Sequence, residues 1–230
     1  VYPELGHTYD IFKQLHEVTR HEITAHALLA LDVSGAHPSC AYAALLAKHG
    51  GCPAAAHKAC PKLSCFVTDR PSAVSQLQQQ YKTPLSDVEA KVKILAALNQ
   101  SSLDPNHKLR KPFLKALVEE RPALEEALLE FELLRPHAVV ISDKAALGGS
   151  ASLMSLLMQA AENTLLLVAI PALRAAGWHF VAPINDALLL RPADASVSLE
   201  GCKRAAVVFQ DAAKAVSVEI RVQVEHEPRR

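Results

Sequence analysis

The sequence lacks several motifs that mark common classes of nucleotide-binding and hydrolytic proteins. Only 8 of its 230 residues are glycine, and none belongs to a Gly-x-x-x-x-Gly-Lys loop of the kind that cradles phosphates in P-loop proteins. No Gly-x-Ser-x-Gly nucleophile elbow is present. The 11 histidines form no His-Glu-x-x-His zinc motif. These absences argue against a P-loop NTPase, an α/β-hydrolase and a zinc-dependent protease.

The chain also lacks net charge and has few aromatic residues. Its 24 Lys and Arg residues balance 24 Asp and Glu residues. This balance argues against a strong non-specific polyanion binder, because such proteins are usually basic, although it is compatible with a local basic patch. Aromatic residues make up 5% of the chain and hydrophobic residues 50%. We therefore expect a sizeable core built mainly from Leu, Ala and Val, and little disorder.

No N-terminal signal pattern is visible. The five cysteines are odd in number and follow no regular framework, which predicts reduced thiols and an intracellular location. The most apolar stretch, residues 151–173, contains Gln159, Glu162 and Pro171, so we expect a buried helix and no membrane span. The chain begins with Val1 instead of Met, and we expect it to be a piece of a larger protein whose other domains are its partners.

The periodicity of apolar residues predicts an α+β fold in which helices cover an antiparallel sheet. Strands are expected at residues 26–33, at residues 178–191 as a strand–turn–strand, and at residues 216–226, where apolar and polar residues alternate. Helices are expected at residues 9–22, 38–48, 71–81, 86–99, 112–120, 122–134, 151–175 and 201–214. Residues 52–66 are expected to be irregular or weakly helical, and residues 138–142 to be a strand or a helix end.

The helix expected at residues 86–99 has a specific start signal. Ser86 and Glu89 have the spacing of a capping box. The same segment predicts one apolar stripe along the helix, formed by Val88, Val92, Leu95 and Leu98.

Two acids stand at the ends of predicted strands. Asp32 ends the first strand, and Asp186 follows Asn185 inside the apolar run VAPINDALLL, at the tip of the predicted hairpin. If these strands are neighbours, the two carboxylates repel each other, and Mg²⁺ would remove that penalty. A shared two-metal site requires the two carboxylates to lie within about 8 Å of each other. The alternative is that each Asp caps a turn.

Three segments carry motifs in a fixed order. The first, LDVSGAHPS at residues 31–39, contains Asp-x-x-x-x-His-Pro-Ser. The second is the helix at residues 86–100, which carries Lys91, and the third is a long apolar helix followed by the hairpin with Asn185-Asp186-Ala187. These segments resemble the first, second and third palm motifs of family-A DNA polymerases and phage-type single-subunit RNA polymerases. In the second motif Asp87 stands in place of an Arg, and an aromatic and a Tyr-Gly pair are missing; in the third, Asn185 replaces the usual His.

The resemblance implies a template-dependent nucleotidyltransferase that makes DNA or RNA on a primer-template. Asp32 and Asp186 would be its catalytic and Mg²⁺-binding residues, and a primer 3′-hydroxyl would attack the α-phosphate of a nucleoside triphosphate. Lys91 would hold the triphosphate, with Arg70 as a further nucleotide-binding cation. An ordinary solvated helix lysine is the alternative for Lys91. The implied architecture is one palm-like domain over residues 1–230, with a palm core at 26–50 and 145–230 and a fingers-like helical insertion at 51–144.

Further residues are candidates for nucleic-acid contact. Gln159 and Glu162 share one face of the long helix, which in the resemblance is directed toward the template; an interhelix hydrogen bond is the alternative. The one compact basic cluster consists of His107, Lys108, Arg110, Lys111 and Lys115. This cluster would contact a nucleic-acid backbone or form a solvated loop.

Other hypotheses stay open. The replaced His and the missing Arg and Tyr-Gly favour a catalytically inactive palm-like domain that binds nucleic acid or a protein, and an unrelated helical interaction domain is a third hypothesis. A zinc site is conceivable at Cys52, His57, Cys60 and Cys65, spaced Cys-x4-His-x2-Cys-x4-Cys. Free buried thiols are the alternative for these cysteines.

Overall fold

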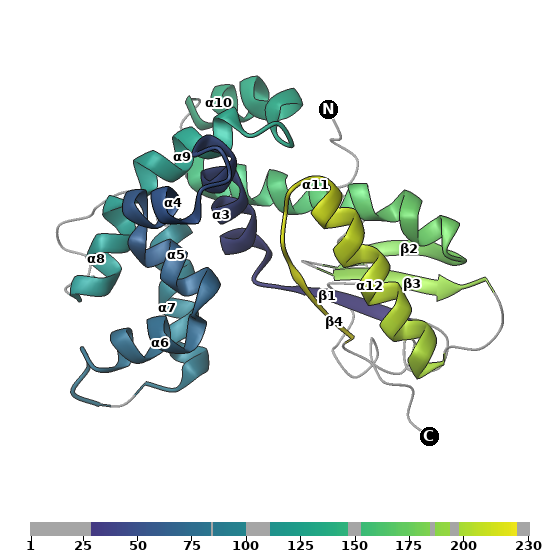
Figure 1. Cartoon of the computed structure of the whole chain (residues 1–230), viewed down its shortest axis with the longest axis horizontal. Coiled ribbons are helices and arrows are strands. Elements are labelled where there is room, and N and C mark those ends of the chain that lie inside the picture. Colours follow the sequence, from purple (N-terminus) through teal and green to yellow (C-terminus); the bar gives the residue numbers. More distant parts are fainter. Residues whose placement is uncertain are drawn as a thin grey trace. The chain divides into compact units, whose positions relative to one another are not determined.

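The computed structural model of the chain (Figure 1) describes residues 29–83, 85–99, 111–146, 153–184, 187–193 and 198–224. The helix predicted at residues 9–22 lies outside these ranges. The chain divides into two compact units, one formed by Val1–Ala36 and Glu162–Arg230 and the other by His37–Ala161. The insertion predicted from the sequence, residues 51–144, is shorter than this second unit.

The first unit contains an antiparallel sheet of four strands, which confirms the predicted α+β class. Its strands are β1 (Leu29–Ser34), β2 (Trp178–Ile184), β3 (Ala187–Pro192) and β4 (Arg221–Val224), arranged in the order β2-β3-β1-β4. Every described pair in the sheet is antiparallel. Strand β1 is therefore central, although its neighbours follow it by more than 150 residues in the sequence.

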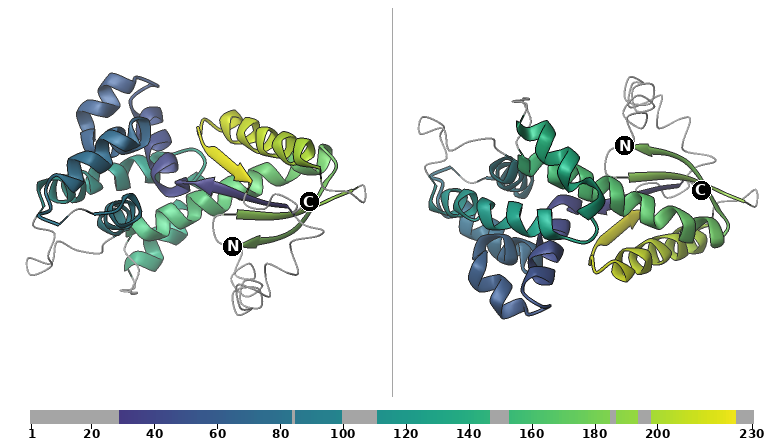
Figure 2. Two further views of the ribbon diagram at one scale, coloured as in Figure 1. Left: turned by 90° about the horizontal axis from the view of Figure 1, so that it is seen from below. Right: turned by 90° about the horizontal axis from the view of Figure 1, so that it is seen from above.

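The described part of this unit also contains helix α12 (Leu199–Ala215) and the later part of α11 (Leu153–Ala175). Figure 2 shows them on the same side of the sheet. The hairpin predicted at residues 178–191 is confirmed by β2 and β3, which follow α11 directly. The chain leaves α11 through Gly177, whose φ of 84° lies in the left-handed region that glycine adopts without steric cost.

The predicted strand at residues 216–226 is shorter in the structure. Helix α12 continues to Ala215, and Ser217 has a φ of 64°, which is incompatible with an extended backbone. Val218 is fully buried, but pairing with β1 begins only at Arg221. The first residues of the alternating pattern thus belong to the end of α12 and the following turn. Alternation shows which side chains are buried, but it does not fix the backbone conformation.

The second unit is helical. Its helices are α3 (Ala36–Lys48), α4 (Pro53–Ala59), α5 (Pro61–Thr68), α6 (Arg70–Gln78), α7 (Asp87–Asn99), α8 (Pro112–Glu119), α9 (Arg121–Glu130), η1 (Arg135–His137), α10 (Ala138–Ala146) and the beginning of α11. Of the two alternatives predicted for residues 52–66, irregular or weakly helical, the structure has the helical one, because this segment forms α4 and α5. Both of these helices begin with Pro at the first helical position, where its missing N–H costs nothing.

Helix α7 confirms its predicted start but buries a different face. Ser86 Oγ accepts the N–H of Glu89 at 3.2 Å, and the Glu89 carboxylate accepts the N–H of Ser86 at 2.8 Å. Val88 and Val92 are 71% and 59% exposed. Of the predicted stripe, Leu98 is fully buried as expected and Leu95 is half-buried. The other buried residues of α7 are Ala90, Ile94 and Ala97. The small side chains of Ala90 and Ala97 allow neighbouring helices to approach α7 closely. Packing against those helices decides which face of α7 is buried.

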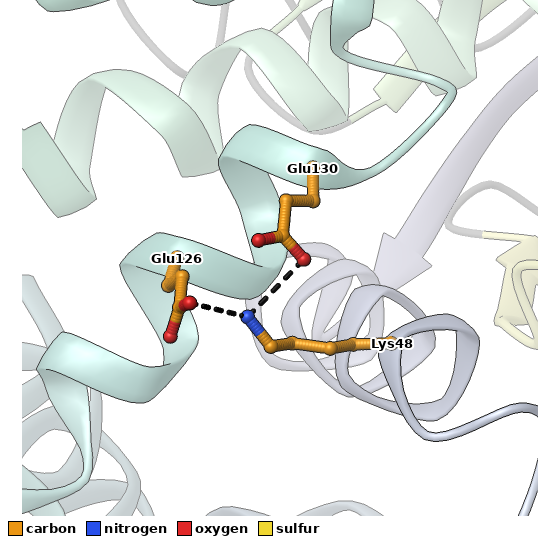
Figure 3. Close-up of polar contacts among 3 residues, drawn as sticks. All are labelled: Lys48, Glu126 and Glu130. Atoms are coloured by element: carbon orange, nitrogen blue, oxygen red, sulfur yellow. Dashed lines mark ion pairs between the residues drawn. The ribbon is translucent and has the colours of Figure 1, made fainter.

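Acid–base pairs connect helices within this unit. Lys48, at the end of α3, lies 2.8 Å from a carboxylate oxygen of Glu126 and 3.1 Å from one of Glu130, both on α9 (Figure 3). The hydrogen bond to Glu126 is the main reason why the pKa of Lys48 is raised. The buried Glu120 accepts the backbone N–H groups of Lys62 at 2.7 Å and Leu63 at 2.9 Å, at the start of α5.

Candidate metal and nucleic-acid site

Asp32 lies near the end of the central strand. Its neighbours in β1, Leu31 and Val33, are fully buried, whereas Asp32 is only half-buried. Because successive side chains of a strand point to opposite faces, Asp32 belongs to the face opposite that of Leu31 and Val33. Its cross-strand partners are Ala187 in β3 and Gln223 in β4.

The second predicted acid, Asp186, lies outside the described residues, as does Asn185. Their chain neighbours are described: Ile184 ends β2, Ala187 begins β3, and the two are paired. Ala187 is also the partner of Asp32. Strands β1 and β3 are therefore neighbours in the sheet, as the two-acid prediction requires. The distance between the two carboxylates involves Asp186, which lies outside the described ranges.

The face that carries Asp32 is polar toward β4. Cross-strand partners share a face, so Gln223 lies beside Asp32, and Arg221 lies beside Ser34, two residues further along each strand. Both β4 side chains are exposed, and Asp32 and Ser34 are half-exposed. The alternation of apolar and polar residues at 216–226 assigns Arg221 and Gln223 only to the polar side of the strand. Their position next to an acid required knowledge of the strand register.

The nucleotide-binding candidates Lys91 and Arg70 belong to the helical unit. Lys91 is half-buried on α7. Arg70 begins α6, and its guanidinium lies 5.1 Å from the centre of the Phe66 ring, within the range of a cation–π contact. Both cations are described within the unit His37–Ala161, and Asp32 in the other unit.

The predicted basic cluster is described only in part, because His107, Lys108 and Arg110 lie outside the described ranges. The ammonium of Lys111 donates to the carbonyl of Gln80 and lies 4.5 Å from the centre of the Tyr81 ring. Lys115 lies 3.8 Å from the carboxylate of Glu119. The described part of the cluster is thus already engaged with groups of its own unit.

Gln159 differs from its predicted environment. The long helix was expected to bury this side chain, but Gln159 is exposed, and its amide donates to Ser155 Oγ at 3.2 Å within the same helix. Glu162, three residues later, is half-buried. An exposed amide needs no interhelix partner and stays available to a ligand.

Two of the four residues of the zinc hypothesis, Cys60 and Cys65, face other groups of the protein. Cys60 is buried, its thiol faces the carbonyl oxygen of Glu120 at 4.0 Å, and burial raises its pKa to about 12. Cys65 faces the carbonyl of Asp69 and the amide of Gln76, and Cys52 is exposed. Among the described residues, no three or more His, Cys, Asp or Glu side chains come together in a way that could hold a metal ion. The structure therefore does not assemble a zinc site from this set.

One described helix, α11, is long and apolar enough to cross a membrane by length and composition. Some of its side chains are buried inside the protein. These include Met154, Leu157, Met158, Ala161, Leu165, Ala169 and Leu173.

Comparison of the chain with protein-family models and with curated proteins finds no match.

Proposed function

We propose that the chain is a reduced polymerase palm with a helical insertion, and that it catalyses template-dependent nucleotidyl transfer with two divalent metal ions. The observation that carries this proposal is the pairing of Asp32 with Ala187. It puts the strand that ends in the first motif beside the strand that begins directly after Asp186. The order that follows, α12 and then β4 on the other side of β1, agrees with the closing elements of a palm.

Chain connectivity supports a shared site for the two acids. Ala187 is the partner of Asp32 and the next residue after Asp186 in the sequence, so the chain segment that carries the second acid continues directly into the strand beside β1. This adjacency of the two segments supports the proposal of one shared pair of ions.

The chemistry of Asp32 supports Mg²⁺ as the ion of the proposed site. Asp32 offers a half-exposed carboxylate, and Mg²⁺ in phosphoryl-transfer sites is usually held by one or two carboxylates, with substrate phosphates and water completing the shell. Asp32 and Asp186 would hold the ions. When bound, the ions would supply charge neutralisation at the attacking and leaving oxygens.

The chain's own contribution would be binding and orientation. The two acids would fix the site at the end of β1. Lys91 and Arg70, which belong to the other compact unit, stay sequence-based predictions for triphosphate binding. Gln159, Lys108, Arg110 and Lys111 would contact the primer-template. The rate enhancement in such a site comes from positioning and charge stabilisation, without a covalent intermediate on the protein.

The second candidate is a catalytically inactive palm-like domain that binds nucleic acid or a protein. The residue that favours it is Asp87. Asp87 stands where the second motif has an Arg, and its carboxylate accepts a hydrogen bond from the Gln78 amide at 3.0 Å. An acid at this position repels a triphosphate instead of attracting it. Asp87 is therefore the described position at which the chain departs from the second polymerase motif, and its carboxylate is already hydrogen-bonded within the helical unit.

Primer extension with Mg²⁺ tests the proposal. We expect incorporation by the wild-type chain and a loss of roughly 100-fold or more in Asp32→Asn and Asp186→Asn, the scale of removing one charge-stabilising group from an active site. Asp211→Asn is the matched control, because Asp211 is an exposed acid on α12 outside the proposed site. Equal incorporation by all four proteins would remove both acids from the mechanism. Primer-template binding without incorporation by the wild type would favour the inactive domain.

A further inference from the structure

We propose that Arg221 binds a phosphate group at the Asp32 site, with Gln223 as a second hydrogen-bonding contact. This inference rests on the proposed function, since it assigns the residues that hold the substrate's phosphates in that site. The ligand chemistry is a phosphate oxyanion, supplied either by a nucleoside triphosphate or by the backbone of the primer-template.

The strand register brings Arg221 within reach of Asp32. Asp32 pairs with Gln223, and Ser34 pairs with Arg221, so Arg221 is the diagonal neighbour of Asp32 on the same face. Side chains in such diagonal positions start about 7 to 8 Å apart, which long side chains can bridge. A phosphate held near the Asp32 carboxylate would therefore lie within the range of the Arg221 guanidinium.

The exposure of the two β4 side chains allows them to contact a ligand. Arg221 and Gln223 are exposed, whereas the two valines between and after them, Val222 and Val224, are half-buried on the opposite face. The partner residues Asp32 and Ser34 are half-exposed. This corner of the sheet thus presents an acid, a hydroxyl, a guanidinium and an amide together.

The chemistry of the four groups is complementary to a metal-bound phosphate. Guanidinium binds phosphate oxygens through two parallel N–H donors, a geometry that an ammonium cannot reproduce. The Gln223 amide can donate one further hydrogen bond. Two divalent ions do not neutralise all the negative charge of a triphosphate and an acid. A guanidinium next to the acid would stabilise the remaining charge on the phosphate.

A purely protective role is the competing explanation for Arg221. Strand β4 is an edge of the sheet, and charged side chains on edge strands prevent pairing with other chains. That role predicts no change in phosphate binding when Arg221 is replaced. It predicts increased self-association instead.

Binding measurements on the full chain distinguish the two explanations. We would compare wild type, Arg221→Ala, Arg221→Lys and the matched control Arg191→Ala, using two probes: inorganic triphosphate with Mg²⁺, and a fluorescent primer-template duplex. Arg191 is exposed on β3, on the face of Asp32 by strand alternation, but four residues or about 13 Å beyond Ala187. Thermal unfolding of each protein verifies that it is folded.

We expect Arg221→Ala to weaken at least one probe roughly tenfold, Arg221→Lys to restore only part of the affinity because it lacks the bidentate geometry, and Arg191→Ala to bind as wild type does. Weakening of triphosphate alone assigns the nucleotide as ligand, and weakening of the duplex alone assigns the nucleic-acid backbone. Equal binding by Arg221→Ala and Arg191→Ala would overturn the inference, as would a wild type that binds neither probe.

The proposed function can fail separately. If the wild type incorporates nucleotides and Arg221→Ala behaves identically in binding and extension, the polymerase proposal stands and the phosphate role of Arg221 is wrong. If the wild type never extends a primer but Arg221→Ala still weakens triphosphate binding, the phosphate site stands and the polymerase activity does not.

Discussion

Replacement of Glu120 by Ala should strongly destabilise the helical unit. The Glu120 side chain is buried, and its two carboxylate oxygens accept the N–H groups of Lys62 and Leu63 at the start of α5. Glu120→Ala leaves these two donors without a partner in a place that water reaches poorly. A hydrogen bond to a charged group contributes about 1.5 to 3 kcal/mol, so we expect the free energy of unfolding to fall by about 3 kcal/mol or more.

The neighbouring residue provides the control. Glu119 is exposed and faces Lys115 across a 3.8 Å gap, an exposed pair of the kind that typically contributes less than about 1 kcal/mol. Urea unfolding of the full chain, followed by far-ultraviolet circular dichroism, measures both variants. If Glu120→Ala costs no more than Glu119→Ala, the capping role of the Glu120 carboxylate is refuted.

The same residue predicts a pH dependence. Burial raises the pKa of Glu120, and the hydrogen bonds from Leu63 and Lys62 oppose that shift only in part. The folded protein therefore holds this proton more tightly than the unfolded chain does. Its contribution to stability is fully present below the unfolded pKa of about 4.3 and is lost as pH rises through the raised folded pKa. As pH rises across that window, the free energy of unfolding of the wild type should fall relative to that of Glu120→Gln. A wild type that becomes more stable than Glu120→Gln as pH rises would contradict the assignment.

Two further predictions concern burial in the same unit. At pH 8, a thiol reagent should label Cys52 rapidly and Cys60 only at the rate of unfolding, because Cys60 is buried and its pKa is about 12; mass spectrometry of the labelled chain measures this, and equal rates would contradict the structure. On α7, Ile94→Ala should lower the free energy of unfolding by about 2 to 5 kcal/mol, because Ile94 is fully buried. Val92→Ala should change it by about 0.5 kcal/mol or less, since Val92 is 59% exposed, and the reverse ranking in urea unfolding would restore the stripe predicted from the sequence.

Local sequence signals determined much of the secondary structure of this chain. Ser86 and Glu89 fix the start of α7 through their own side chains, and the apolar run before Asp32 becomes the buried strand β1. These predictions hold because caps and strand burial depend on residues only a few positions apart. The α+β class follows from the separation of such strands by helices.

Tertiary packing decided what local patterns could not. The face that α7 buries depends on which helices pack against it, and the start of β4 depends on where α12 stops and the chain turns at Ser217. The sequence alone singled out Asp32 and Asp186 as candidates. Only the sheet register, Asp32 with Ala187 on one side and Gln223 on the other, brings the two acid-bearing segments together and adds Arg221, because pairing between strands nearly 200 residues apart is set by the whole fold.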